Sequence, residues 1–167
     1  MQSPVQSQQH QQLMNYYNSI LQKREQIKKT TAPLQFMKII HMKPGMSKSE
    51  DFNTSFVVLD RYQPIQTKKD IIDQFLVADE TAAIRLSLFE GRGVGLQPGD
   101  IVTLHYGHCS VWKGNLVLYA GRKGILTRTG RFTMLFNERR NMSQDDWEED
   151  PPGSNNYKLK ASQQNVQ

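Results

Sequence analysis

The side chains best suited to chemistry in this sequence are aromatic rings set beside cations. In a run of alternating apolar residues, Phe89 falls on the face opposite the buried set, together with Arg85 and Ser87. Tyr119 falls in the same way on the polar face of a second alternating run. Exposed rings can stack on nucleic-acid bases while neighbouring cations follow the phosphates. These residue types therefore favour a ligand made of single-stranded nucleic acid.

A turn adds a further ring and a further cation. Trp112 and Lys113 lie within the sequence Val-Trp-Lys-Gly-Asn, and turn residues are usually displayed at the surface. Each ring also has a structural interpretation. Phe89 and Tyr119 could cap the end of a barrel, and Trp112 could pack under a loop, because aromatic residues are often buried. We favour the interpretation in which at least one of the three rings is exposed and stacks on bases.

The charge distribution also points to a polyanion. The chain of 167 residues has a formal net charge of +5, and its 16 acidic residues are all absent from the stretch Ile101 to Asn137. A long stretch with one sign of charge suits a polyanionic ligand, although a basic face can also serve solubility alone. The cations of this stretch are Lys113, Arg122, Lys123, Arg128 and Arg131.

No metal, cofactor or catalytic site is predicted. Cys109 is the only cysteine, so an internal disulfide or a thiolate metal cluster cannot form, and the four histidines lack paired ligand spacing. The glycine-rich stretch Gly91–Gly95 lacks the Gly-Lys-Ser/Thr ending of a phosphate loop and is interpreted as a connector. Among the histidines, His108 could stack on a base. No arrangement of a nucleophile with a base can be argued, so we do not expect an enzyme.

Short β-strands must position these residues. Strand-type runs separated by turn signals occupy residues 34–137, and two of them flank Asp79-Glu80-Thr81 as a hairpin. Their spacing, with no long helical pattern between them, predicts a small closed or nearly closed barrel. The expected runs are Phe36–His41, Asn53–Tyr62, Ile71–Ala78, Ala82–Phe89, Ile101–Tyr106, Asn115–Ala120 and Arg131–Phe136.

The two ends of the chain differ from this central part. Residues 1–33 begin with a glutamine-rich tract, and the spacing of Leu13, Tyr17, Ile20 and Ile27 predicts an amphipathic helix over 12–29. Residues 138–167 are acidic and then polar, so we expect a disordered tail that the fold does not need. No run of about 18 apolar residues occurs, so we expect no membrane span. The predicted organisation is an extension (1–33), a barrel (34–137) and a tail (138–167).

Four short motifs in the barrel region carry a resemblance to a known family. They are Ala-Asp-Glu-Thr-Ala-Ala-Ile (78–84), Leu-Gln-Pro-Gly-Asp-Ile (96–101), Ser-Val-Trp-Lys-Gly (110–114) and Leu-Tyr-Ala-Gly-Arg (118–122). In this order and spacing they resemble the eukaryotic simple single-stranded DNA-binding proteins, the B subunits of the sensor-of-single-stranded-DNA (SOSS) complex. The resemblance covers roughly residues 40–137. The Leu-Gln-Pro-Gly-Asp turn is common among OB-folds, whereas its combination with the other motifs is more specific.

The resemblance implies an all-β, five-stranded OB-fold barrel and a set of base-stacking positions. Phe89 stands where the family typically has tryptophan, Trp112 where phenylalanine is usual, and Tyr119 matches directly. His108 stands where a tyrosine is usual. Together with the neighbouring polar residues, the predicted nucleic-acid-binding set is Phe89, Arg85, His108, Trp112, Lys113, Tyr119, Arg122 and Lys123.

The resemblance also implies a protein partner and a setting. The SOSS scaffold, the A subunit, would be gripped around Arg131 and Phe132, of which Phe132 agrees with the family and Arg131 replaces an acidic residue. The expected function is single-stranded DNA binding without strong sequence specificity, in a nuclear complex for DNA repair. Two alternatives remain open: a protein-interaction subunit of a telomere, replication or RNA-processing complex, and binding of single-stranded RNA, because stacking reads neither sugar.

Overall fold

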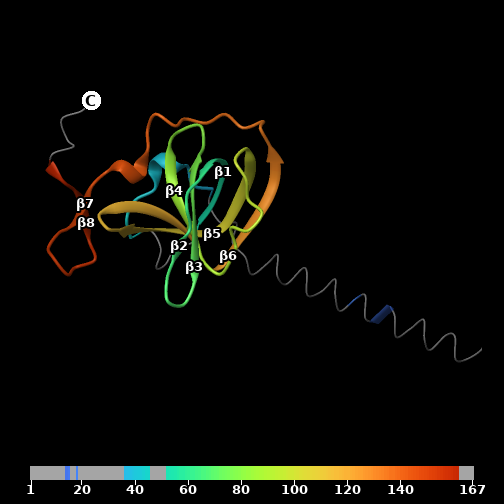
Figure 1. Ribbon diagram of the computed structural model, residues 1–167, viewed down its shortest axis with the longest axis horizontal. Helices are drawn as coiled ribbons and strands as arrows, with labels where there is room; N and C mark the ends of the chain where they lie inside the picture. The colour runs from blue at the N-terminus through green and yellow to red at the C-terminus, as the bar shows by residue number, and fades with distance from the viewer. Residues whose placement is uncertain (1–13, 16–17, 19–35, 46–51, 162–167) are drawn as a thin grey trace, which may run out of the picture. The chain divides into compact units, whose positions relative to one another are not determined.

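The computed structural model describes residues 14–15, 18, 36–45 and 52–161 (Figure 1). The chain divides into two compact units, Met1–Pro33 and Leu34–Gln167. Of the amphipathic helix expected over 12–29, Met14, Asn15 and Asn18 are helical, and the rest lies outside the described residues. The N-terminal helix therefore stays a prediction.

The second unit is built from β-strands and two short 3-10 turns. The elements, in chain order, are η1 (Ile39–His41), β1 (Phe52–Arg61), β2 (Ile65–Gln66), β3 (Ile71–Ala78), β4 (Ala83–Leu88), β5 (Asp100–Trp112), β6 (Asn115–Arg131), η2 (Met142–Gln144), β7 (Trp147–Glu149) and β8 (Tyr157–Leu159). Within the described residues, no helix is long and apolar enough to cross a membrane.

Five of these strands close into a barrel. The strands are hydrogen-bonded in the order β1-β5-β6-β4-β3, and an additional β1–β3 pairing closes the circle, while β2 pairs only with β3. All the pairings are antiparallel except that between β4 and β6. A small, closed or nearly closed barrel of five strands is the arrangement of the OB-fold. The predicted all-β, five-stranded barrel is confirmed.

Two of the expected strands are absent from the described chain. Phe36 forms one isolated bridge with Asn53, and the residues that follow it fold into η1. The buried Asp79 holds this turn, because its carboxylate accepts a hydrogen bond of 2.9 Å from the Ile39 N–H. At the other end, β6 runs on to Arg131, so the predicted strand Arg131–Phe136 is wrong. There Phe132 has a φ of +57°, which takes the chain out of the sheet.

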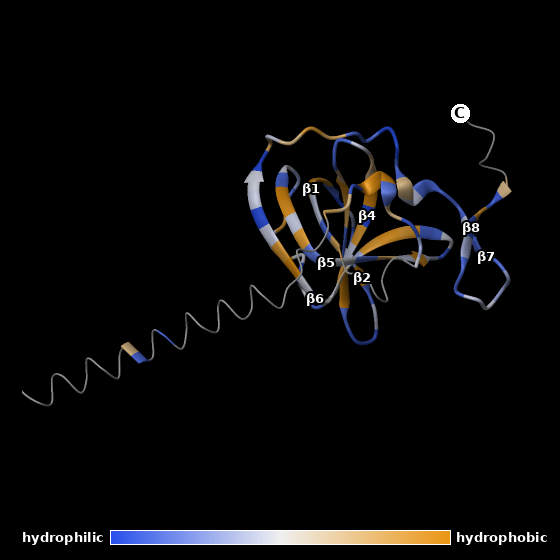
Figure 2. Cartoon of the chain, turned by 180° about the vertical axis from the view of Figure 1, so that it is seen from behind, coloured by the Kyte–Doolittle hydropathy of each residue, from blue (hydrophilic) through white to orange (hydrophobic). Residues whose placement is uncertain are grey.

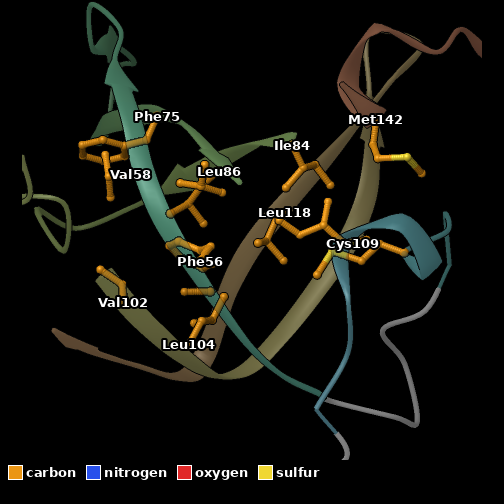
Figure 3. Close-up of a cluster of buried hydrophobic side chains, with 14 of the residues drawn as sticks. Phe56, Val58, Phe75, Ile84, Leu86, Val102, Leu104, Cys109, Leu118 and Met142 are labelled. Atoms are coloured by element: carbon orange, nitrogen blue, oxygen red, sulfur yellow. The ribbon is translucent and has the colours of Figure 1, made fainter. Parts of the chain in front are cut away.

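The barrel interior is a continuous apolar cluster (Figure 3). Side chains from β1, β3, β4, β5 and β6 alternate into it, and η1 adds Ile39 and its C-cap Met42 at the edge of the barrel. Cys109 lies in this cluster, and burial raises the pKa of its thiol well above the ordinary value. The single cysteine is therefore an inert core residue.

The chain after Asn137 folds back onto the barrel, so the prediction of a disordered tail is wrong for residues 138–161. Met142 is only 6 % exposed and belongs to the core cluster, as Figure 3 shows. The hydroxyl of Ser143 accepts a hydrogen bond of 2.8 Å from the Arg85 N–H and donates one to the Leu116 carbonyl. It thereby bridges β4 and β6. Residues 162–167 of the predicted tail lie outside the described residues.

Candidate nucleic-acid interface

Three aromatic rings form a row across the outer face of the barrel, which we call the ring row: Phe89, Tyr119 and His108. Register places Tyr119 of β6 beside His108 of β5 on one side and beside Ser87 of β4 on the other. The centroids of the Phe89 and Tyr119 rings are 6.0 Å apart, and those of the His108 and Tyr119 rings are 5.4 Å apart. The interplanar angles are 20° and 19°. These neighbouring, near-parallel rings offer flat apolar surfaces of the kind on which bases stack.

The ring row is partly exposed. Phe89 is 38 % exposed, as the alternation of β4 predicts, whereas Tyr119 is half-buried. Burial raises the pKa of the Tyr119 hydroxyl, and the positive charge of Arg85 opposes the shift. The phenol therefore stays protonated at neutral pH, so the row presents no negative charge to a phosphate backbone.

The same face continues towards β3 through residues that the sequence reasoning missed. The guanidinium of Arg85 lies 5.5 Å from the centroid of the Tyr62 ring, just after the end of β1. Beside it, the Gln74 side-chain amide donates a hydrogen bond of 3.3 Å to the Ser87 hydroxyl. Tyr62 thus adds a fourth ring next to a predicted cation. In the sequence, Tyr62 was marked only by its aromatic type and its place at the end of the alternating run Asn53–Tyr62.

Trp112 and Lys113 form the tip between β5 and β6. Trp112 lies opposite Asn115 in the register and, at two-residue spacing, on the same face of β5 as His108. It is 37 % exposed, and the Nζ of Lys113 lies 4.6 Å from its ring centroid. The interpretation in which Trp112 packs under a loop does not fit this exposure. One ring face already carries a cation that a phosphate could attract away.

The predicted cations Arg122 and Lys123 lie in a bulge of β6. Gly107 pairs with Ala120 and His105 with Ile125, so residues 121–124 leave the ladder between them. Lys123 is exposed there, while the side chain of Arg122 lies outside what the structure describes. Arg92, which no sequence pattern had marked, comes from the glycine-rich connector and donates a hydrogen bond of 2.7 Å to the Gly121 carbonyl. The bulge begins two residues after Tyr119. It lies at the His108 end of the ring row, because a Cβ added at Gly121 would lie 3.4 Å from the Nδ1 of His108.

Two other cations of the acid-free stretch do not join this face. Arg131 and Arg128 both pair with the fully buried Asp100, at N–O distances of 3.0 and 3.7 Å. They lie at the opposite end of the β5–β6 ladder from Trp112. The basic stretch is therefore divided between the two ends of the β5–β6 ladder, and Asp100 balances only one of the two positive charges at the end away from Trp112.

Phe132, which with Arg131 was predicted to bind a partner, belongs to a separate apolar surface. Its ring covers Gly99, where an added Cβ would lie 2.0 Å from the nearest ring carbon. Phe132 is 74 % exposed and Leu135 is 83 % exposed, in the segment that crosses over the barrel after β6 (Figure 1). With Arg131 stacked at 5.3 Å, Phe132 borders a hollow of about 300 Å³ that Val57, Pro98 and Met134 also line. This surface is distinct from the ring row.

The described residues bring together no group of three or more His, Cys, Asp or Glu side chains that could hold a metal ion.

We expect the replacement of Lys113 by glutamine to reduce the salt dependence of oligonucleotide binding. Each phosphate contact to a single strand contributes about 0.7 to the slope of log affinity against log salt, because it releases a counterion. Loss of one contact should lower the slope by about that amount while the Trp112 ring remains. Titrations with a 30-base oligonucleotide at four salt concentrations measure the slope. An unchanged slope would place Lys113 outside the phosphate path.

Comparison with known proteins supports the fold. No protein-family model matches the chain. Its structure is similar to that of a hypothetical protein from Arabidopsis thaliana, with a TM-score of 0.56 and 21 % sequence identity, over 72 % of this chain and 90 % of the other. The barrel and this neighbour share a fold.

Two archaeal structures are also similar at lower scores. The OB domain of a Thermoplasma acidophilum protein has a TM-score of 0.48 and 19 % identity over 62 % of this chain and 94 % of the other. The replication factor A related protein from Methanobacterium thermoautotrophicum has a TM-score of 0.39 and 15 % identity over 56 % of this chain and 96 % of the other.

Proposed function

We propose that this protein binds single-stranded nucleic acid, with DNA as its main ligand, and that it acts as a binding protein rather than an enzyme. The ring row is the observation that carries the proposal. Phe89, Tyr119 and His108 lie near-parallel on the outer face of an OB barrel, with Arg85 and Lys123 nearby on β4 and β6. Rings take bases of any type, so this face supports binding without strong sequence specificity.

The resemblance to the SOSS B subunits extends the proposal to a nuclear role in DNA repair. Three residues of the motifs, Asp79, Gly99 and Lys113, each have a definite structural role. Asp79 organises the β3–β4 turn, Gly99 adopts a φ of +89° under Phe132, and Lys113 covers the ring of Trp112. These contacts support a shared architecture for the motifs.

A titration with three labelled ligands tests the proposed function. The full chain should bind a 30-base oligo-dT more tightly than a duplex of the same length, because paired bases cannot splay onto the rings. An oligo-U of the same length decides between DNA and RNA as the main ligand. Affinity for oligo-dT should fall as salt rises. Absent binding, or binding that ignores salt, would overturn the proposal.

The apolar surface around Phe132 favours a second candidate function, that of a protein-interaction subunit. Exposed Phe132, Leu135 and Phe136 lie along one segment, and large exposed apolar groups mark protein contacts. A SOSS-like scaffold subunit is the partner that we propose for it. Co-purification of the full chain with such a scaffold, lost in Phe132→Asp, tests this candidate. If the chain bound the scaffold but no oligonucleotide, the role of a protein-interaction subunit would be favoured over nucleic-acid binding.

A further inference from the structure

An acid-rich hairpin stands at the Trp112 end of the candidate interface. Residues 145–161 contain five carboxylates and two lysines, whereas the preceding stretch 101–137 contains no acid. The hairpin β7–β8 joins the β5–β6 tip directly, because the Trp147 N–H donates a hydrogen bond of 2.7 Å to the Gly114 carbonyl. In both Figure 1 and Figure 2 it lies beside that tip, and Figure 2 shows it as largely hydrophilic.

The register places hairpin carboxylates on the same face as Trp112. Asp146 forms an antiparallel bridge with Asn115, which is itself opposite Trp112, and residues opposed in a sheet point to the same side. Two inter-strand steps put Asp146 about 10 Å from Trp112. Alternation then adds Glu148 to this face, further along the hairpin.

The two faces of the hairpin have different roles. On the face of Asp146, Glu148 and Asp150 share a single cation, since Lys158 lies 3.7 Å from the first and 3.2 Å from the second. On the other face, Trp147 packs against the core cluster. Glu149, also on that face, accepts a hydrogen bond of 3.3 Å from the Tyr157 hydroxyl. One side anchors the hairpin. The other presents Glu148 and Asp150, two carboxylates that share the single ammonium of Lys158.

Several contacts hold the hairpin in place on the barrel, so it is not attached as a movable lid would be. Met142 is part of the barrel core, and the Ser143 hydroxyl bridges β4 and β6. Arg140 forms a salt bridge with Asp145 immediately before the hairpin. Moving the hairpin aside would require Trp147 to leave its packing against the core. Carboxylates held in this way repel a phosphate backbone wherever it approaches them.

We propose that the β7–β8 hairpin is an acidic wall that ends the nucleic-acid path at the β5–β6 tip and so limits the length of strand that the face can hold. The inference rests on the proposed function, because a wall needs a strand to stop. A strand lying on the ring row and Trp112 would meet Asp146 and Glu148 next. Phosphates beyond Trp112 therefore gain no favourable contact.

Two substitutions with the same charge change separate the wall from a general charge effect. Glu148→Gln removes a carboxylate from the wall face, and Glu149→Gln removes one from the anchored face. Affinity for labelled oligo-dT of 6 to 30 bases is measured for both full-length variants at low ionic strength. We expect Glu148→Gln to bind about twofold more tightly, as one unit charge about 10 Å from a phosphate implies, and Glu149→Gln to gain less, because its carboxylate lies on the opposite face and further from the strand.

The double variant Glu148→Gln/Asp150→Asn should amplify the effect. Its affinity should rise about fourfold, should continue to increase at oligonucleotide lengths where the wild type has levelled off, and should match the wild type in 1 M salt. If the wild type binds but Glu148→Gln and Glu149→Gln behave alike, the wall is overturned and the proposed function stands. If the wild type binds no oligonucleotide, both are overturned.

Discussion

Replacing Tyr119 by alanine is expected to weaken binding to single-stranded oligo-dT about 5- to 150-fold. Loss of one base stack typically costs about 1–3 kcal/mol, which converts to this range. Tyr119 should show the full effect because it lies in the middle of the ring row, against both Phe89 and His108. Its removal breaks the row into two separate rings. Titration of a labelled 30-base oligonucleotide measures the change.

The substitution Tyr119→Phe is the matched control. It keeps the ring and loses only the hydroxyl, so it should retain most of the affinity. The melting temperatures of both variants show whether a loss of affinity comes from unfolding. Replacing a buried aromatic residue by alanine costs about 3–5 kcal/mol of stability. Normal binding by a folded Tyr119→Ala variant would mean that bases do not stack on the ring row.

The second large effect is expected in folding. Replacing Met142 by alanine should lower the free energy of unfolding by about 2–5 kcal/mol, because Met142 is 6 % exposed within the barrel core. Truncation after Asn137 should cost at least as much, since it also removes the Ser143 hydroxyl from between β4 and β6. Urea denaturation of the full chain and of the two altered chains gives these values.

Met142→Leu separates core packing from the chemistry of the thioether. Leucine has a similar volume and no polar atom, so this variant should lose less than about 1.5 kcal/mol. A truncated chain that unfolds cooperatively at the wild-type urea concentration would refute the role of residues 138–161 in the fold.

The alternation of apolar residues was enough to predict the barrel and the outward face of β4. Period-two spacing fixes which side of a strand each residue takes. Ser87 and Tyr119 therefore lie on the same side of adjacent strands, with Phe89 one residue past the end of β4. The turn before β4 was likewise predicted from the Asp79-Glu80-Thr81 sequence. The Asp79 carboxylate accepts hydrogen bonds from the N–H groups of Thr81 and Ala82 in this turn. These features are local, and local spacing encodes them.

The missed features depend on contacts between residues far apart in the chain. Met142 is one apolar residue within an acidic, polar segment, so no periodicity marks it as a core residue. Tyr62 becomes part of the face because the β1–β3 and β3–β4 pairings together bring Arg85 near it. Asp100 lies one residue before the acid-free stretch, and its one carboxylate pairs with both Arg128 and Arg131, about 30 residues further along the chain. Composition averaged along the chain cannot reveal such pairings.

The most direct test of the ring row as the base-stacking site is a chemical-shift map of the unaltered protein titrated with oligo-dT. Ring and backbone signals of Phe89, His108 and Tyr119 should shift progressively, together with the side-chain N–H of Trp112. Signals of Phe132 and Leu135, on the separate apolar surface, should stay in place. Shifts confined to Phe132 and Leu135, with the ring row unmoved, would contradict the account.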